Sequence, residues 1–181
     1  MKEYTKSGLS QNNQDLEAAS PKEIIKWAWE TFEGKIIASS SFQTQSIPLL
    51  YFISQEAPLI PIVFVDTGFH FAETIEFRDH IVDLFGLTLK VVEPQIKGED
   101  FLSSFGPLFN QSPDACCFYN KVAPFQLYLK NYQAWISGIH RDQTDNRRHS
   151  PVIGQHPFLP FSKINPMASW SAREIDLFIE E

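Results

Sequence analysis

The sequence predicts one α/β domain built on a mainly parallel sheet with helices on both faces. Short apolar runs typical of strands alternate with segments of roughly 10 to 16 residues that have helical apolar spacing, the pattern of βαβ units. The length of 181 residues suits a single domain, and a hydrophobic fraction of 43% supplies enough apolar side chains for its core.

Five segments are predicted to be helices. The first, Ser20–Gly34, opens with Ser-Pro, a pair typical of an N-cap and a first helical turn. Gly86 follows another helical segment and has the character of a C′ glycine. The last helix is expected to begin at a serine cap, Ser169 or Ser171. The four later helices are expected over 46–55, 71–86, 121–131 and 169–181.

Five apolar runs are predicted to be strands, and Leu59–Asp66 is the clearest because β-branched residues dominate it. The others are expected over 35–39, 87–94, 134–140 and 161–167. The stretch Pro94–Pro113 is expected to be a loop or short helix at one edge. The prediction is therefore a Rossmann-like, doubly wound domain over residues 20–181, preceded by a polar tail over residues 1–19.

Charge and composition narrow the functional classes. The net charge of −7 argues against a general nucleic-acid binder, which needs a basic face. No apolar run approaches the roughly 20 residues that span a bilayer, and the N-terminus has no secretory signal, so a cytoplasmic protein without a membrane span is expected. Two cysteines do not make a disulfide framework. The net charge does not argue against binding of a small anionic ligand by local Arg and Lys side chains.

Polar loops follow three of the predicted strands, at the edge of a parallel sheet where ligands bind. The first, Ser39–Ser46, carries hydroxyls into a helix N-terminus and is either an anion site or a polar turn with a cap. In the second, Asp66 either accepts hydrogen bonds from a ribose or base or caps its turn. The third, Gly138–Ser150, holds three arginines and has Lys163 nearby, and is either a solvated loop or an anion site.

Cys116 and Cys117 are the two cysteines of the chain, and they are adjacent. Adjacent cysteines rarely bridge each other because the disulfide would be strained. They are either ordinary half-buried thiols or two ligands of a metal or iron–sulfur cluster, which normally takes four. Lys121 follows the second cysteine by four positions.

Taken in order, these motifs resemble the assimilatory adenylyl-sulfate and phosphoadenylyl-sulfate reductases, which have a PP-loop adenine-nucleotide hydrolase-like fold. The similarity extends over nearly the whole chain after about residue 20. The stretches that carry it are "ASSSF" (38–42), "DTGFHFAET" (66–74), "CCFYNKVAPF" (116–125), "GIHRDQTDNR" (138–147) and "INPMASWSAREIDLFI" (164–179).

The resemblance implies a function and a set of site residues. The implied reaction is thiol-dependent reduction of adenylyl sulfate or phosphoadenylyl sulfate to sulfite in sulfate assimilation, with thioredoxin or glutaredoxin as the thiol partner. Members of the family usually self-associate, so a homo-oligomer is also implied. The phosphate and sulfate end would bind the serine loop and the loop after the fourth strand, and adenosine would bind the loop after Leu59–Asp66. The implied substrate-binding residues are Ser39, Ser40, Ser41, Phe42, Asp66, Thr67, Gly68, Gly138, His140, Arg141 and Arg147.

In the cluster-bearing branch of the family, a double cysteine and a later C-x-x-C hold a [4Fe–4S] cluster. The resemblance therefore implies that Cys116 and Cys117 supply two of four cluster ligands, and that Lys121 acts electrostatically between cluster and substrate. The family's nucleophilic cysteine also lies in a C-terminal segment, and this chain has no third cysteine. Ending at Glu181, inside a predicted helix, it is expected to be truncated and to bind the nucleotide without turnover of its own.

The chain departs from the family pattern at His140 and Asn120, where arginines are usual, and at Gln43, where glycine is usual. Two alternatives stay open. An ATP-using PP-loop enzyme is disfavoured because "SSSFQTQS" lacks the glycines and aspartate that grip pyrophosphate. A non-catalytic module that binds an adenine nucleotide would use the same pocket.

Overall fold

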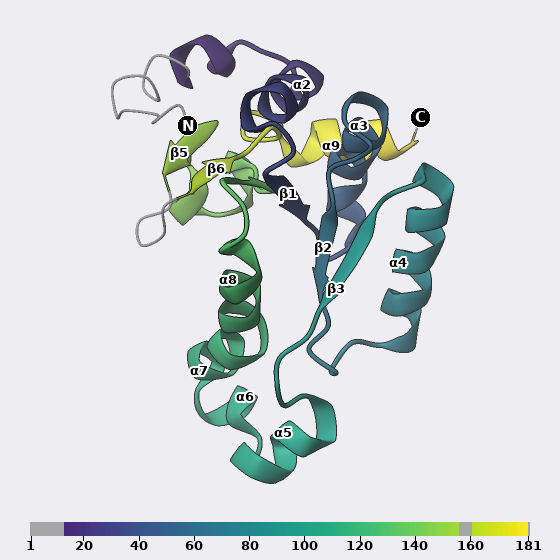
Figure 1. Cartoon of the computed structure of the whole chain (residues 1–181), viewed down its shortest axis with the longest axis vertical. Helices are drawn as coiled ribbons and strands as arrows, with labels where there is room; N and C mark the ends of the chain where they lie inside the picture. The colour runs from purple at the N-terminus through teal and green to yellow at the C-terminus, as the bar shows by residue number, and fades with distance from the viewer. Residues whose placement is uncertain (1–12, 156–160, 181) are drawn as a thin grey trace.

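The computed structural model describes residues 13–155 and 161–180, and its centre is a six-stranded sheet with the order β3-β2-β1-β4-β6-β5. All neighbouring strands are parallel except β5, which runs antiparallel to β6 at the edge. The α/β prediction is confirmed. The strands are β1 (Ile36–Ser39), β2 (Ile62–Val65), β3 (Leu89–Val92), β4 (Ala134–Ser137), β5 (Ile153–Gln155) and β6 (Ser162–Ile164) (Figure 1).

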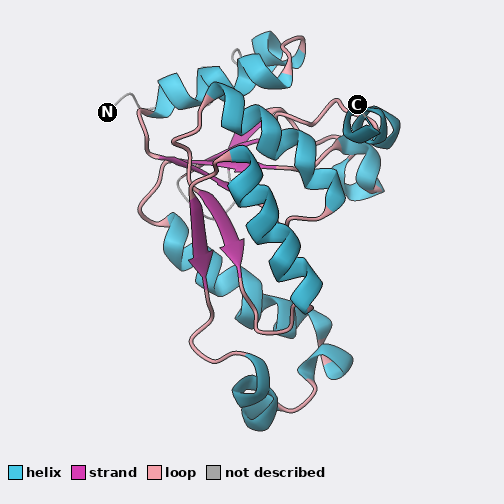
Figure 2. Cartoon of the chain, turned by 90° about the vertical axis from the view of Figure 1, so that its right-hand side faces the viewer, coloured by secondary structure: helices cyan, strands magenta, loops and turns pink. Residues whose placement is uncertain are grey.

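The predicted helices are present within a few residues of their expected bounds, with additional short ones between β3 and α8. The α-helices after the first short one, labelled in Figure 1 and coloured cyan in Figure 2, are α2 (Pro21–Phe32), α3 (Ile47–Glu56), α4 (Ala72–Phe85), α5 (Gly98–Phe105), α6 (Leu108–Gln111), α7 (Pro113–Cys117), α8 (Ala123–Leu129) and α9 (Ala172–Glu180). Four single turns complete the list: η1 (Thr44–Ser46), the π-helical η2 (Phe118–Val122), η3 (Arg141–Gln143) and η4 (Asp145–Arg147).

The two faces of the sheet are covered unequally. Side chains from α2, α3, α4 and α9 pack on one face over residues such as Ile36, Ile62 and Ile136, and form the larger core. The other face has a smaller cluster around Ile37 and Val63, to which α8 contributes. A cavity lined by Val63, Phe125 and Trp135 opens on this second face.

The sequence signals at helix ends work as predicted. Ser20 caps α2 in a reciprocal capping box with Glu23, which satisfies backbone N–H groups at the helix start. Ser171 and Glu174 make the same exchange at the start of α9. Gly86 ends α4 with φ +63°, a left-handed conformation that glycine adopts without strain.

The region between β3 and β4 holds more helix than the pattern predicted. Helices α5, α6 and α7 precede the segment expected to be helical over 121–131, and the π turn η2 joins α7 to α8. Pro124 explains the widened turn, because its ring lacks the N–H that would bond to the carbonyl of Asn120. The N–H of Ala123 bonds instead to the carbonyl of Phe118, five residues back.

Part of the predicted tail packs against the domain. Residues 13–17 are helical and Leu16 is buried in the main core. Glu17 pairs with Arg141 across 2.7 Å, and Asn13 accepts a hydrogen bond from Ile153 N–H at 2.9 Å. Contacts with the domain therefore begin before residue 20. Within the described ranges, none of the helices is long and apolar enough to cross a membrane.

Candidate functional site

The three predicted loops meet at one edge of the sheet. They follow β1, β2 and β4, which are immediate neighbours in the order β2-β1-β4. The chain continues from β1 to β2 on one side, whereas β4 lies on the other side of β1. Ligands of doubly wound sheets bind where the strand order reverses in this way. The candidate site therefore lies over the carboxyl end of β1.

The loop after β1 has an unusual backbone. Phe42 has φ +53°, which is uncommon for a residue with a side chain, and its ring is buried against Phe64 at a centroid distance of 5.9 Å. The N–H of Phe42 donates to Ser40 Oγ at 2.9 Å. This conformation places Phe42 beneath the loop, while Ser39, Ser40 and Ser41 line the cavities above it. Strained backbone of this kind concentrates at functional sites.

A polar cavity of about 250 Å³ opens on one side of the serine loop. Arg147 and Gly138 contribute to it from the loop after β4, and Gln143 accepts a hydrogen bond from Arg147. Hydroxyls and a guanidinium are suited to phosphate or sulfate oxygens. Its lining residues are Ser39, Ser40, Ser41, Gln43, Gln45, Ser46, Gly138, Ile139, Gln143 and Arg147.

A second cavity, also about 250 Å³, opens on the other side of the same three serines and is mainly apolar. Lys121 reaches it from η2, so the fold brings this lysine beside a loop that precedes it by about 80 residues. The apolar walls suit a planar base. Its lining residues are Ser39, Ser40, Ser41, Val63, Phe64, Val65, His70, Lys121, Val122, Phe125 and Trp135.

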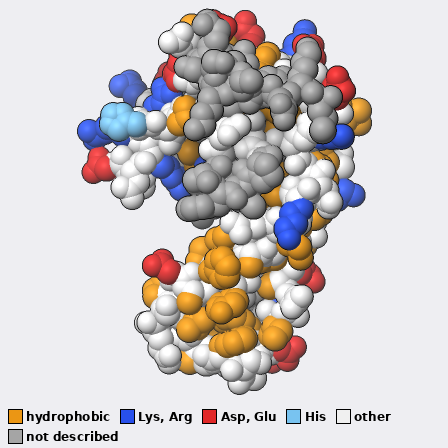
Figure 3. Space-filling view, turned by 60° about the vertical axis from the view of Figure 1, so that its left-hand side comes forward, with side chains coloured by type: hydrophobic (Ala, Val, Ile, Leu, Met, Phe, Trp, Pro, Cys, Tyr) orange, Lys and Arg blue, Asp and Glu red, His pale blue; other side chains and the backbone are white. Residues whose placement is uncertain are grey.

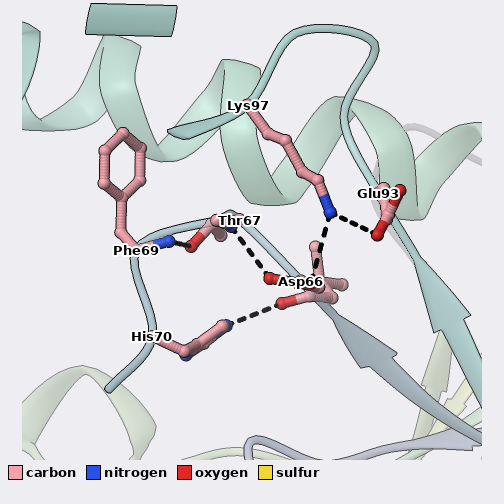
Figure 4. A network of polar contacts seen from close by, with 8 residues as sticks. Asp66, Thr67, Phe69, His70, Glu93 and Lys97 are labelled. Atoms are coloured by element: carbon pink, nitrogen blue, oxygen red, sulfur yellow. Dashed lines mark hydrogen bonds and ion pairs between the residues drawn. The ribbon is translucent and has the colours of Figure 1, made fainter. Parts of the chain in front are cut away.

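Asp66 belongs to a polar network that locks the loop after β2 (Figure 4). Its carboxylate accepts the N–H of Gly68 at 2.9 Å and pairs with Lys97 at 3.4 Å, and Lys97 also bonds to Glu93. His70 Nε2 lies 3.0 Å from the carbonyl oxygen of Val65. Burial acts to raise the pKa of Asp66, but the Gly68 hydrogen bond and the Lys97 charge outweigh it and hold that pKa below its ordinary value.

Gly68 makes the close approach of two loops possible. It has φ +76°, and a Cβ at this position would lie 2.8 Å from the backbone nitrogen of Gly98. Asp66, Thr67 and Gly68 are absent from the lining of both cavities beside the serine loop, whereas Val65 and His70 line the apolar one. In this structure Asp66 therefore organises the loop, and the predicted contact of residues 66–68 with adenosine stays a prediction.

The arginines of the third loop have different surroundings. Arg147 lines the polar cavity, as predicted for an anion contact. Arg141 is directed elsewhere, because its guanidinium bonds to Glu17 at 2.7 Å and to the carbonyl oxygen of Ser150 at 2.8 Å. Arg141 thus pairs with a carboxylate distant in the sequence, at residue 17, whereas Arg147 lines the cavity.

His140 is buried, with an exposed fraction of 2%, and is not among the residues that line either cavity beside the serine loop. Neither ring nitrogen has a hydrogen-bond partner among the described residues. Burial lowers the pKa of His140; the nearby Asp142 acts to raise it and Arg147 to lower it. The imidazole is therefore neutral near pH 7, and a positive charge does not replace the arginine usual at this position.

Cys116 is half-buried and Cys117 is exposed at the end of α7. Asn120 Nδ2 donates to the carbonyl oxygen of Cys116 at 3.0 Å and lies 3.6 Å from its sulfur. In the described ranges, no three His, Cys, Asp or Glu side chains are grouped as metal ligands. The two thiols by themselves do not complete the four-ligand set that an iron–sulfur cluster takes.

Several lining residues were absent from the predicted set. His70 and Phe125 lie inside stretches that carry the family resemblance, whereas Trp135 lies outside them. Trp135 Nε1 donates to Ser39 Oγ at 2.8 Å, a contact between β4 and β1. Trp135 lies between Ala134 and Ile136, both apolar, so only the tendency of a buried indole N–H to find a hydrogen-bond partner could have indicated this contact.

A third cavity of about 670 Å³ lies between the end of β3, α5 and α8, away from the serine loop. Exposed apolar side chains gather over this lower part of the molecule (Figure 3). They include Phe105, Phe109, Phe118, Tyr119 and Leu127. None of the predicted site residues lines this cavity.

Known proteins resemble this chain over most of its length. An adenosine 5'-phosphosulfate reductase from Halalkalibacterium halodurans is 33% identical over 95% of the chain and 75% of that protein. A phosphoadenosine 5'-phosphosulfate reductase from Vibrio parahaemolyticus is 34% identical over 96% of the chain and 68% of its own length. The crystal structure of a phosphoadenylyl-sulfate reductase from Candida auris, a phosphate complex, has a TM-score of 0.85 and 25% identity over 97% of the chain and 86% of that chain.

The family model described as the phosphoadenosine phosphosulfate reductase domain matches residues 35–181. This range includes the serine loop, the network around Asp66, the cysteine pair with Lys121, and Arg147. The resemblance inferred from the motifs is confirmed. This chain belongs to the phosphoadenosine phosphosulfate reductase family.

Proposed function

We propose that this chain binds adenylyl sulfate or phosphoadenylyl sulfate and provides the nucleotide-binding core for its thiol-dependent reduction to sulfite. The observation that carries the proposal is the serine loop with a cavity on each side. One cavity is apolar and suits the adenine base, and the other is polar, has Arg147 and suits the phosphate and sulfonyl oxygens. Membership of a reductase family supports the same substrate class.

The chemistry that this core would serve has two steps. A cysteine thiolate attacks the sulfur, the bond from sulfur to the phosphate oxygen breaks, and the adenosine phosphate leaves with the bond electrons. A dithiol partner such as thioredoxin or glutaredoxin then releases sulfite from the S-sulfocysteine and becomes a disulfide. Positive side chains at Arg147 and Lys121 would stabilise negative charge on the phosphosulfate oxygens.

For Cys116 and Cys117 we propose the role of two of the four ligands of a [4Fe–4S] cluster, which would act electrostatically together with Lys121. The exposed Cys117 and half-buried Cys116 are accessible for such ligation, and Lys121 lies one turn further along. No step above depends on the cluster. We further propose that the protein works in the cytoplasm and self-associates.

Isothermal titration calorimetry tests the binding part of this function directly. The chain should bind adenylyl sulfate or phosphoadenylyl sulfate with a Kd in the micromolar range. It should bind ATP more weakly, because the serine loop lacks the glycines and the aspartate that bind pyrophosphate. Arg147→Met should weaken binding about tenfold or more, since it removes a charged hydrogen-bond donor. Arg148→Met is the matched control, because Arg148 is exposed and pairs with Asp145.

A sulfite-release assay with thioredoxin tests the second part. The chain alone should bind the nucleotide without catalytic sulfite release, since its two cysteines are both assigned to the cluster. Tight binding of ATP with pyrophosphate release would replace the proposal by an ATP-using enzyme. Binding of none of these nucleotides would refute it.

A further inference from the structure

Lys163 is a charged side chain near the candidate site whose role is unassigned. It lies on β6 directly opposite Trp135 of β4, in the register that pairs these two residues. Its ammonium lies over the Trp135 ring, 4.7 Å from the centroid, on the face of the sheet that carries α8 and the apolar cavity, which Trp135 lines and Lys163 itself does not. It therefore shares a sheet face with the serine loop.

The positive charge of Lys163 has no carboxylate partner among the described residues. The ion pairs of the described residues involve other cations, and the ammonium group of Lys163 contacts the Trp135 ring. Burial lowers the pKa of Lys163, and the charge of Arg147 lowers it further. A cation that is partly buried and has no carboxylate partner among the described residues is unfavourable unless an anion joins it.

Trp135 links Lys163 to the serine loop. Its indole nitrogen donates to Ser39 Oγ at 2.8 Å while its ring lies beneath the ammonium. An indole N–H is a donor only, so the Ser39 hydroxyl accepts it and keeps its own proton free for another acceptor. A cation over an indole ring is attracted to its face, which holds both side chains in place.

We propose that Lys163 is a further substrate-binding residue, which contributes positive charge together with Arg147 to the anionic phosphosulfate end held at Ser39. The ligand chemistry is a phosphate ester or mixed phosphate–sulfate anion on a nucleoside. This inference rests on the proposed function, because it assigns a new residue to the same site. An anion at Ser39 would offset the positive charge of Lys163, which lies over the same indole that donates to Ser39.

The test uses Lys163→Met, which keeps an unbranched apolar side chain over Trp135 and removes the charge, and Lys163→Arg, which keeps the charge. Calorimetry with adenylyl sulfate, AMP and adenosine gives the readout. Lys163→Met should weaken binding of adenylyl sulfate and AMP about tenfold or more, with adenosine affinity unchanged, because loss of a charged hydrogen bond affects only the anions. Lys163→Arg should retain most of the affinity for the anions.

Lys22→Met is the matched control. Lys22 also lies over an aromatic ring, that of Phe52 at 5.8 Å, but on the helix-covered face away from the site. The Lys22→Met variant should bind all three ligands with the same affinity as the unmodified chain. If Lys163→Met does not fold by circular dichroism, Lys163→Gln takes its place with the same expectation.

The outcomes separate this inference from the proposed function. If the unmodified chain binds adenylyl sulfate and Lys163→Met binds it equally well, the role of Lys163 is refuted and the proposed function stands. Equal weakening of adenosine and adenylyl sulfate would also refute it, because the side chain would then act through packing. Binding of none of the three ligands by the unmodified chain would overturn both.

Discussion

Trp135 and Ser39 illustrate how one neutral side chain can prepare an anion site. The indole donates to the serine oxygen at 2.8 Å and leaves the hydroxyl proton available to a ligand oxygen. Trp135 also forms part of the wall of the apolar cavity, so it contacts both regions proposed for the substrate. The orientation of a single hydroxyl thus depends on a residue from a different strand.

Replacing Trp135 with phenylalanine tests this dependence. Trp135→Phe keeps an aromatic wall but removes the N–H, and the affinity for adenylyl sulfate should fall by about three- to tenfold, the worth of one neutral hydrogen bond. Calorimetry measures it. Trp29→Phe, in a partly buried tryptophan that packs against the main core, is the control. Unchanged affinity in Trp135→Phe would mean that the Ser39 contact has no part in binding.

His140 predicts a pH dependence of stability. Burial lowers its pKa in the folded protein, so the unfolded chain takes up the proton first as the pH falls below about 6.5. Folding stability is therefore lost as the pH falls through this value. His140→Phe removes the titrating group and two ring nitrogens that have no partner among the described residues, and its stability should fall less between pH 7.5 and pH 5.5.

Urea denaturation at the two pH values measures the difference. His80→Gln, at an exposed position of α4, should follow the unmodified chain. A His140→Phe chain that loses as much stability as the unmodified chain would show that His140 is not the titrating group.

Among the elements, the connection after β2 is positioned by its contact with the loop that begins α5. Gly68 and Gly98 approach so closely that a Cβ on Gly68 would lie within 3.0 Å of two backbone atoms, and Lys97 pairs with Asp66 at the same place. The approach fixes where His70 enters the apolar cavity.

Gly68→Ala should therefore destabilise the protein strongly, by about 2 to 5 kcal/mol, because it combines a left-handed backbone with a steric overlap. Gly86→Ala is the matched control: φ is also positive, at +63°, but nothing lies within 4 Å of the added methyl. It should cost only about 1 to 2 kcal/mol. Urea denaturation measures both free energies of unfolding. Equal losses would mean that the contact with Gly98 relaxes without cost.

Local signals made the main elements predictable. Ser20 and Gly86 mark helix ends by chemistry that acts within a few residues, and the β-branched run over 59–66 indicates a buried strand. The π turn before α8 depends on the carbonyl that Pro124 leaves unbonded, a detail finer than apolar spacing can resolve. This π turn places Lys121 at the apolar cavity.

At the scale of the whole molecule, the candidate site was predictable as a set of loops but not as a set of contacts. The strand order brings the loops after β1, β2 and β4 together, as a parallel sheet requires. Arg141 pairs with Glu17 whereas Arg147 lines the polar cavity, and Asp66 pairs with Lys97. Such pairings join residues that lie far apart in the sequence, so no local pattern contains them.

The helices pack unequally on the two faces of the sheet, and the candidate site lies beside the loops after β1 and β4. Side chains from α2, α3, α4 and α9 pack on one face, α8 packs on the other, and the serine loop lines two cavities. The two cavities share Ser39, Ser40 and Ser41, which makes the loop the junction between an apolar and an anionic part of one ligand.

A crystal structure of the chain with adenylyl sulfate tests this arrangement most directly. The account predicts adenine against Phe125 and Trp135 in the apolar cavity, with the phosphosulfate oxygens at Ser39–Ser41 and Arg147. Nucleotide bound in the cavity between β3 and α8, or with its phosphosulfate away from the serine loop, would contradict it.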